Sequence, residues 1–595
     1  MDHAKLDPTL AAVLDELGGI DGLGLHGAGV ERPQLGLTRA RLGRAPAQVR
    51  VFLELAAPAP AASMAAPEMP AGVELHGGVE LHGQETMRTA TVALEALDAL
   101  SEHPGVRRIV GARCLRPHLD LAVTRIGAAD LRRRSGAGGR GVVVGIVDTG
   151  VESGHPAFAG RILRCWDQTL PGSGVAEGAY GRELGPGELE LSEDHAGHGT
   201  YVAGAAAGRD ANYPGVAPDA DLVVVKSDLL DVHLADGLRY VFRLAGELGR
   251  PAVVLLGAGG SGDAHDGTDA FSAMIDAASG PGRIVVCSAG NDGDAGSHAG
   301  VVLGNGTTAR VSLAVGGPAP EGAGRRAAFV GWYAGSDRIA VAVSCPTGLQ
   351  TPFQEVETGA PPTRLYQVPD GDVRIVTPGP DPANGDHCFL VEVSPSSPAG
   401  PPVQATGWAL RLRGDDVSSG RVDVWALDPD RAPLGGPHAS HDTLVGAPGA
   451  ATRAITVGAF TTKVDWLNLV GHAHQAGFDV EDLCAFSSPG PRRDGTPKPD
   501  LVAPGAMVAA SLSATSAFHV PYLVDNLNVL RAGTSGAAAL VAGVVALLLE
   551  LDPALGPEQA KDRLRDHCRI PGLEPGSHHP AWGYGLLDVT GLTLP

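Results

Sequence analysis

Four uninterrupted apolar runs constrain the fold of this chain more than any other feature. They read GVVVGIV (141–147), DLVVVK (221–226), PAVVLL (251–256) and RIVVC (283–287). Runs without polar alternation are typical of strands buried on both faces, as in a parallel sheet. Between two of them apolar residues recur at helical spacing, at Leu234, Leu238, Val241, Phe242, Ala245 and Leu248. Strands that alternate with helices predict an α/β domain, a mostly parallel sheet with helices on both faces.

The pattern changes between residues 301 and 440. Short alternating segments there are separated by Gly, Pro, Asp and Asn, and they read VSLAV, FVGWY, IAVAVS, VRIV, FLVEV, WALRL and VDVWAL. Many short strands with turn residues between them predict a β-sandwich or jelly roll. The α/β pattern returns at 451–460 and continues to the end. We therefore expect a β unit inserted into an α/β domain that is split in sequence.

The N-terminal part has a pattern of its own. Residues 1–45 are a polar, Gly-rich extension, and 49–55 alternates like a strand. Residues 91–103 have apolar positions at helical spacing and 106–110 is again strand-like, so 46–118 is predicted to be a small α+β module. Inside it the hexapeptide GVELHG occurs twice, over 72–83. We interpret this repeat as an exposed loop, in which His76 and His82 would titrate near neutral pH.

These patterns divide the 595 residues into five parts. They are an extension (1–45), the α+β module (46–118), the first part of the α/β domain (119–300), the β insert (301–440) and the second part of the α/β domain (441–595). A single hydrophobic core stops growing near roughly 250–300 residues, so more than one core is expected.

Charge and leader sequence limit the partners and the compartment. The net charge of −22 repels phosphate backbones and anionic membrane surfaces, which argues against nucleic acid and membranes as partners. The N-terminus lacks a charged-then-apolar signal pattern, and the longest apolar run, 536–549, is shorter than the ~20 residues that span a bilayer. We expect a soluble, cytoplasmic protein. The 7 cysteines include no CxxC pair, which favours reduced thiols over disulfides or a zinc site.

Four short segments carry the side chains of chemical interest: VDTG with Asp148, HGT with His198, SAGN with Asn291 and GTS with Ser535. Asp148 and Asn291 each follow a buried strand, and strand C-termini form the functional edge of an open α/β sheet. Ser535 opens an apolar helix, whose N-terminal N–H groups suit an oxyanion. Each residue alone has an ordinary explanation as a turn, a surface side chain or a helix cap. Together, in the order Asp, His, Ser, they predict a catalytic triad of the subtilisin type.

The same segments resemble the signature blocks of the subtilase family of serine proteases. The blocks are GIVDTGVESGHPAF, GHGTYVAG, VVCSAGND, RAGTSGAAALVAG and KPDLVAPG. The resemblance covers roughly 120–300 and 441–590. RILRCWDQT, AHDGTDAF and the β insert resemble the subgroup that includes the clostridial spore-germination subtilases, which carry a jelly-roll insert at this place. Residues 46–118 resemble a subtilase prodomain, which folds and inhibits the catalytic domain.

The resemblance implies a role for each residue. Ser535 is the nucleophile, His198 is its base, Asp148 orients His198, and Asn291 with the Ser535 N–H binds the oxyanion. Gly257, Ala258, Gly259, Gly260, Ser288, Ala289 and Gly290 match the segments that hold the substrate as an added strand. The implied activity is that of a serine endopeptidase acting on peptides or proteins, with its own prodomain as inhibitor. No cofactor and no metal ligand are predicted, while a structural calcium ion and the oligomeric state stay open.

Some positions depart from the family pattern near the reacting groups. Tyr201 replaces a second His, and Gly536, Ala539 and Leu540 replace Met, Pro and His. The usual SLGG is GAGG at 257–260. Two alternatives to hydrolysis therefore stay open: a catalytically silent binding or signalling module, and a peptide ligase or macrocyclase on the same fold.

Overall fold

The computed structural model forms two compact units, each built from two separate stretches of chain. The first contains Met1–Arg113 and Asp294–His441, and the second contains Cys114–Gly293 and Asp442–Pro595. The structure describes residues 5–6, 48–55, 69–81, 85–93, 96–111, 116–117, 125–315, 326–356, 363–396, 403–429 and 432–592. The prediction of more than one hydrophobic core is confirmed within these ranges.

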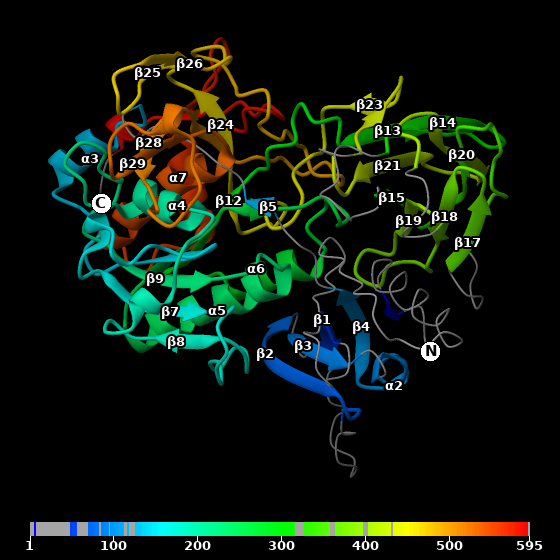
Figure 1. The fold of residues 1–595 in the computed structure, drawn as a ribbon, viewed down its shortest axis with the longest axis horizontal. Helices are drawn as coiled ribbons and strands as arrows, with labels where there is room; N and C mark the ends of the chain where they lie inside the picture. The colour runs from blue at the N-terminus through cyan, green and yellow to red at the C-terminus, as the bar shows by residue number, and fades with distance from the viewer. Residues whose placement is uncertain are drawn as a thin grey trace. The chain divides into compact units, whose positions relative to one another are not determined.

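The second unit is built on a ten-stranded sheet (Figure 1). All pairings in it are parallel except β7–β8 and β30–β31 at its two edges. The prediction of a mostly parallel sheet is therefore confirmed. Its strand order is β30 (Cys568–Arg569), β31 (Leu586–Leu587), β27 (Leu501–Ala506), β24 (Ile455–Thr461), β12 (Arg283–Ser288), β10 (Ala252–Leu256), β6 (Val143–Asp148), β9 (Asp221–Lys226), β7 (Ile162–Asp167) and β8 (Arg182–Leu184).

Helices cover both faces of this sheet. Along β6, Val144 and Ile146 share a core with the helix α7 (Thr534–Leu551), whereas Gly145 faces Val241 of α5 (Asp231–Glu247) on the other side. Period-two alternation of side chains explains how one apolar strand serves both layers. The remaining helices of this unit are α3 (Ala128–Ser135), α4 (His198–Ala207), α6 (Ala270–Ala278) and α8 (Pro557–Arg565).

Helix α7 is the central helix of this unit. Small residues let α4 approach it, since a Cβ at Gly543 would lie 2.7 Å from the carbonyl oxygen of Ala206. Within the described ranges α7 is the one helix that is long and apolar enough to cross a membrane, and 89% of that window is buried inside the protein. Such burial is typical of the core helix of a globular domain.

The first unit contains a β-sandwich, made by residues 294–441. One sheet has the order β17 (Thr363–Val368), β18 (Gly371–Val376), β19 (His387–Ser394), β15 (Ala327–Tyr333), β21 (Arg421–Ala426), β13 (His298–Val302) and β23 (Ala439–Ser440). The other has the order β16 (Arg338–Ser344), β20 (Trp408–Asp416), β14 (Thr308–Leu313) and β22 (Leu434–Gly435). Apolar side chains from both sheets form one core. Five of the seven alternating segments of the sequence lie wholly in strands, as predicted, and VSLAV and VDVWAL continue past the ends of β14 and β21.

The same unit contains the N-terminal module, residues 48–111. Its antiparallel sheet has the order β2 (Val73–Leu81), β3 (Glu85–Ala93), β1 (Gln48–Leu55) and β4 (Val106–Gly111), and it carries the short helix α2 (Leu97–Glu102). The predicted helix over 91–103 is wrong at its start, because β3 continues to Ala93 and pairs with β1. Cross-strand pairing overrides the helical spacing of these apolar residues.

The repeated hexapeptide forms strand β2, and not the exposed loop that we expected. His76 is buried, and its Nε2 lies 2.8 Å from Thr91 Oγ1 on the neighbouring strand. A sequence rich in Val, Leu and Gly pairs along β3 with one irregularity, between Leu75 and Gly78. His82 lies outside the described residues. The cysteines that the structure describes are free and buried, which confirms the prediction of reduced thiols for Cys165, Cys287, Cys345, Cys388, Cys484 and Cys568.

Candidate active site

Asp148 and His198 form a buried pair where strand β6 ends and helix α4 begins. His198 Nδ1 donates to Asp148 Oδ1 at 2.6 Å, and each residue is 1% exposed. The N–H of Thr149 donates to the same carboxylate oxygen at 2.7 Å. Helix α4 begins at His198 itself, directly after Gly197, which takes the left-handed conformation with φ of 70°. The pairing engages Nδ1 and orients the ring, so Nε2 is the nitrogen that would exchange a proton with a nucleophile.

Ser535 lies in the first turn of α7 and is fully buried. Its Oγ donates to the carbonyl oxygen of Gly257 at 3.1 Å. A Cβ at Gly257 would lie 3.0 Å from His198 Cε1, 3.2 Å from Asp148 Oδ2 and 3.3 Å from Ser535 Cβ. The structure therefore brings the three predicted triad residues together around one glycine, which has no room for a side chain.

Asn291 follows β12, and its amide is oriented by Thr534. Asn291 Oδ1 accepts from the Thr534 N–H at 2.9 Å and from Thr534 Oγ1 at 3.0 Å. Gly290 N in turn donates to Thr534 Oγ1 at 3.2 Å. With its oxygen occupied in this way, Asn291 presents the NH₂ group as its remaining polar group, which is the donor that an oxyanion requires.

Asp194 connects the aspartate and histidine segments, and the sequence analysis missed it. It is fully buried. Its Oδ1 accepts from Thr149 Oγ1 and from the N–H of Gly197, each at 2.8 Å. Its Oδ2 accepts from the N–H and the hydroxyl of Thr200, at 2.8 and 2.7 Å. An acidic residue shortly before a helix start, in the segment DHAGHGT, was the signal that could have identified it.

The predicted substrate-binding segments differ in what they offer a ligand. Ala258 and Gly259 form the short strand β11 and pair antiparallel with β5, residues Arg116–Pro117. Gly260 N, by contrast, donates to the Ala447 carbonyl at 3.1 Å. Gly290 uses both of its backbone groups within the fold, with Thr534 and with Ser488. Ser288 pairs with Val457 of β24 inside the sheet, and the Ala289 N–H donates to the Val457 carbonyl. Of the seven predicted residues, Ala258 and Gly259 are therefore those that pair with β5.

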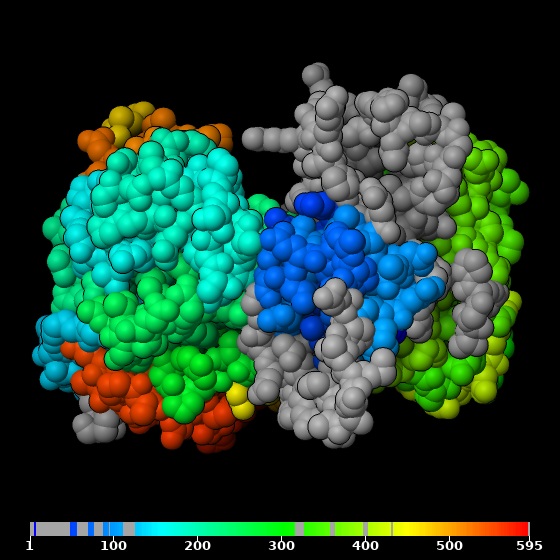
Figure 2. Space-filling view, turned by 90° about the horizontal axis from the view of Figure 1, so that it is seen from below, coloured from blue at the N-terminus to red at the C-terminus, as the bar shows by residue number. Residues whose placement is uncertain are grey.

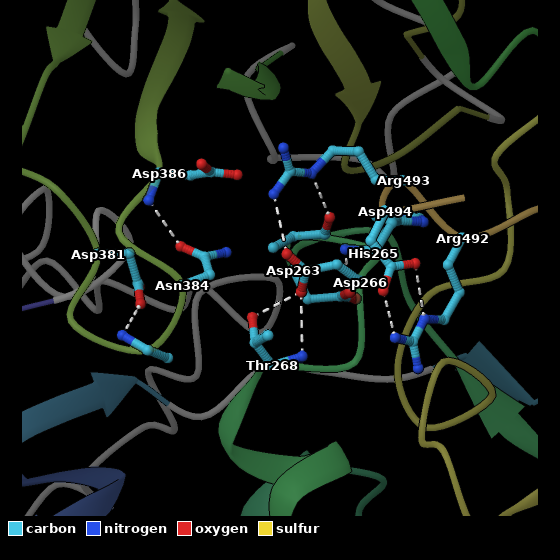
Figure 3. Close-up of polar contacts among 12 residues, drawn as sticks. Asp263, His265, Asp266, Thr268, Asp381, Asn384, Asp386, Arg492, Arg493 and Asp494 are labelled. Atoms are coloured by element: carbon cyan, nitrogen blue, oxygen red, sulfur yellow. Dashed lines mark hydrogen bonds and ion pairs between the residues drawn. The ribbon is translucent and has the colours of Figure 1, made fainter. Parts of the chain in front are cut away.

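A fixed loop follows this strand. Asp263 Oδ2 accepts from the N–H of Ala447 at 2.9 Å, and the buried His265 donates its backbone N–H to Asp263 Oδ1 at 2.7 Å. Arg493 reaches over the loop to Asp266 Oδ2 at 2.9 Å, as Figure 3 shows. The side chains of Arg493 and Asp266 are 10% and 6% exposed, so a largely shielded ion pair holds the loop that follows the candidate substrate strand.

The profile of the subtilase family of peptidases matches residues 139–367 and 397–585, together more than half of the chain. The chain belongs to the subtilase family. Curated subtilases resemble it only in part: the serine protease AprX of Bacillus subtilis is 31% identical over 20% of this chain and 26% of AprX. The intracellular serine protease of Paenibacillus polymyxa is 30% identical over 26% of this chain and 43% of that protein. The chain thus spans half or less of the curated relatives that it matches.

The subtilase fold itself is shared with a solved structure. The CspB protease of Clostridium perfringens superposes with a TM-score of 0.64 at 23% identity, over 78% of this chain and 94% of that chain. At this identity the likeness establishes the fold, and it confirms the α/β subtilisin-like architecture predicted from the sequence.

The departures from the subtilase pattern lie in buried surroundings. The Arg531 guanidinium lies 5.8 Å from the centre of the buried Tyr201 ring, so a cation–π contact is present at this position. Gly536, Ala539 and Leu540 are buried in α7. The side chains that depart from the family pattern therefore act through packing around α7, the helix that carries Ser535, and not as solvent-exposed groups.

A buried charge cluster joins β24 and β27 in the subtilase segment KPDLVAPG. Lys498 Nζ donates to Asp500 Oδ2 and to the Ala454 carbonyl, each at 2.8 Å, and to Thr456 Oγ1 at 2.7 Å. Burial lowers the pKa of Lys498 to about 8. The cations Lys498 and Lys561 outweigh the effect of burial on Asp500 and lower its pKa to about 2. The hydrogen bonds of Lys498 to Ala454 and Thr456 therefore link the segment before β27 to the start of β24.

Proposed function

We propose that this subtilase is a serine endopeptidase that hydrolyses peptide bonds through an acyl-enzyme. The observation that carries the proposal is the buried hydrogen bond from His198 to Asp148. Ser535 lies close to the same glycine, Gly257, as these two residues. A buried His oriented by a carboxylate and next to a serine at a helix N-terminus is the arrangement that nucleophilic catalysis requires.

The geometry supports one course of reaction. Ser535 Oγ attacks the peptide carbonyl carbon while its proton passes to His198 Nε2, and Asp148 stabilises the imidazolium that forms. The Asn291 NH₂ and the Ser535 N–H hold the oxyanion. The C–N bond then breaks, and His198 returns the proton to the leaving amine. Water attacks the acyl-enzyme with His198 again as base, which releases the acid product and restores Ser535.

The first substrate of the enzyme is proposed to be its own chain, with residues 46–118 acting as the prodomain. Strand addition is a common way to bind an extended peptide. Here the pairs Ala258–Pro117 and Gly259–Arg116 define an antiparallel register. We propose that a bound substrate keeps this register for one further residue, which would set position 118 of the chain opposite Gly257. Since Gly257 adjoins Ser535, we propose cleavage of the His118–Leu119 bond and retention of the freed prodomain as an inhibitor.

The silent binding module and the ligase remain the alternatives. The intact Asp148–His198 pair supports catalysis over a silent module. Triad chemistry uses side chains, backbone N–H groups and water, so we propose that no cofactor is needed. The cytoplasmic location and the exclusion of nucleic acid and membrane surfaces as partners remain predictions.

A fluorophosphonate probe tests the catalytic proposal directly. The wild type should become labelled and should turn over a chromogenic peptide, while Ser535→Ala should not be labelled and should lose activity by about 10⁶. Equal turnover by the two proteins would refute the proposal.

Mass spectrometry and N-terminal sequencing of the same pair test self-cleavage. The wild type should give a new N-terminus at Leu119, and Ser535→Ala should keep one intact mass. One intact mass in both proteins would argue against self-cleavage, while a different new N-terminus would overturn the proposed register alone.

A further inference from the structure

The N-terminal module and the sandwich share one hydrophobic core within the first unit. Buried residues of the module's sheet and of α2, among them Val51, Leu100 and Ile109, form a single cluster with Val376 and Leu390 of the sandwich. Val376 is 0% exposed and Leu390 is 1% exposed. In the space-filling view of Figure 2, the lighter blue surface of the module is on the side that faces the yellow-green surface of the sandwich.

The two sandwich residues belong to the outer face of their sheet. Val376 and Leu390 are direct partners on β18 and β19, and their neighbours Ile375 and Val391 point into the sandwich core. Side chains alternate along a strand, so Val376 and Leu390 point away from that core. The outer face of a sandwich is ordinarily polar and solvated. The apolar pair Val376 and Leu390 on this face, which the module covers, is therefore typical of a surface that binds a partner.

A buried ion pair lies beside this apolar pair. Arg108 Nη2 on β4 donates to Asp381 Oδ2 at 2.7 Å, and the two side chains are 7% and 6% exposed. Breaking a buried ion pair from one side leaves an uncompensated charge, which makes such a contact selective for its partner.

The sandwich holds its half of this ion pair in place without help from the module. Asp381 Oδ1 accepts from the N–H of Ala383 at 2.8 Å, and the Asp381 carbonyl accepts from the N–H of Gly385 at 2.7 Å. The turn continues through Asn384 and Asp386, as Figure 3 shows. The carboxylate is thus fixed before Arg108 arrives, which lowers the entropic cost of binding.

We infer that the sandwich is a docking surface for the N-terminal module of the same chain, and that it keeps the module bound once the chain between them is cut. That the chain is cut by its own activity is part of the proposed function, on which this inference rests. The contacts between the module and the sandwich do not depend on that cleavage. It assigns the sandwich the task of retaining the inhibitory segment.

The test uses the full chain with Ser535→Ala, so that the protein's own activity plays no part. The recognition sequence of a site-specific protease is inserted between Gly111 and Arg116, so that the freed module ends before β5 and cannot be held by its pairing with β11. After cutting, size-exclusion chromatography measures how much module co-elutes with the remainder, and a dilution series gives the dissociation constant.

Charge reversal then examines the contact surface. Arg108→Asp or Asp381→Arg alone should weaken retention by about 100-fold or more, because each places like charges together in a buried site. The double variant should recover most of the retention, because the swapped charges can pair again. Circular dichroism of each single variant checks that it is folded. Asp415→Asn removes an ion pair with Arg413 on β20, in the opposite sheet of the sandwich, so it serves as the control and should retain the module like the parent.

Two results would overturn the inference. One is a module that elutes separately from the parent after cutting. The other is retention by both single variants equal to that of the parent. Neither result bears on peptidase activity, because an external protease makes the cut, so failure here is distinct from failure of the proposed function.

Discussion

Asn291 accepts two hydrogen bonds from Thr534, the residue immediately before Ser535. The candidate oxyanion donor is therefore oriented by the segment that carries the nucleophile. A shift of the Ser535 segment would also move the Asn291 amide, because both hydrogen bonds come from the first turn of α7.

Asn291→Ala should lower kcat by about 10²–10³ with little change in KM, because the oxyanion exists only in the transition state. Thr534→Val keeps the shape but loses the hydroxyl donor, and it should lower kcat by about tenfold. Thr534→Ser keeps that donor and should stay near the wild type. Steady-state kinetics on a chromogenic peptide measure both constants. Full kcat in Thr534→Val would show that the hydroxyl does not orient Asn291.

Asp194→Asn should lower kcat by about 10- to 100-fold and leave KM nearly unchanged. Asn cannot accept all four hydrogen bonds that hold Thr149, Gly197 and Thr200. The segments that carry Asp148 and His198 are then no longer held in a fixed position relative to each other. The readout is the separation of kcat from KM, together with thermal unfolding.

The control for this change is Asp337→Asn in the sandwich. Asp337 is equally buried and accepts three backbone N–H groups, from Ser418, Ser419 and Gly420. It should destabilise its unit while kcat stays unchanged. Equal loss of kcat in both variants would show that Asp194 affects activity only through the stability of the fold and does not position the triad.

Gly257→Ala should lower kcat by about tenfold or more. The new methyl group would meet His198, Asp148 and Ser535 at 3.0–3.3 Å, so each must move by a few tenths of an ångström. Gly246→Ala on α5 adds a methyl group where nothing lies within 4 Å, and its kcat should equal that of the wild type. Unchanged activity in Gly257→Ala would mean that the triad tolerates displacement.

Lys498 should make the stability of the protein increase with pH in the alkaline range. Burial lowers its pKa from 10.5 to about 8, so between these values the unfolded chain binds a proton that the folded protein does not. The free energy of unfolding must then rise with pH across this window, by about 1–3 kcal/mol.

Urea unfolding of Ser535→Ala, with and without Lys498→Met, measures this rise from pH 8 to 10.5. The difference between the two proteins removes the effect of other titrating groups. A rise of the same size in both would contradict the assignment to Lys498.

The sequence predicted the sheet, the sandwich strands and the side chains that meet at Gly257. These features follow from local patterns, such as unbroken apolar runs and short motifs at strand ends. It failed where a partner distant in sequence decides the outcome. Thr91 to Ala93 lie in a strand because β1 pairs with them, and His76 is buried because Thr91 and Arg50 lie beside it.

Asp194 and Thr534 show a second limit of the sequence. The segment DHAGHGT marks Asp194 as an acid near a helix start, but which groups Asp194 and Thr534 bind depends on the fold that brings those groups within reach. The pairing of Arg116–Pro117 with Ala258–Gly259 is of the same kind, since it joins residues more than a hundred positions apart.

The shared core of the N-terminal module and the sandwich also constrains how the chain acquires its structure during synthesis. Val51 and Ile109 leave the ribosome long before Val376 and Leu390, the residues that complete their core. Until then the nascent module exposes an apolar edge, and about 180 residues of the α/β unit must emerge while neither unit is complete. Contacts this distant in sequence make folding slow. We therefore expect the nascent chain to depend on chaperones up to about the synthesis of residue 441.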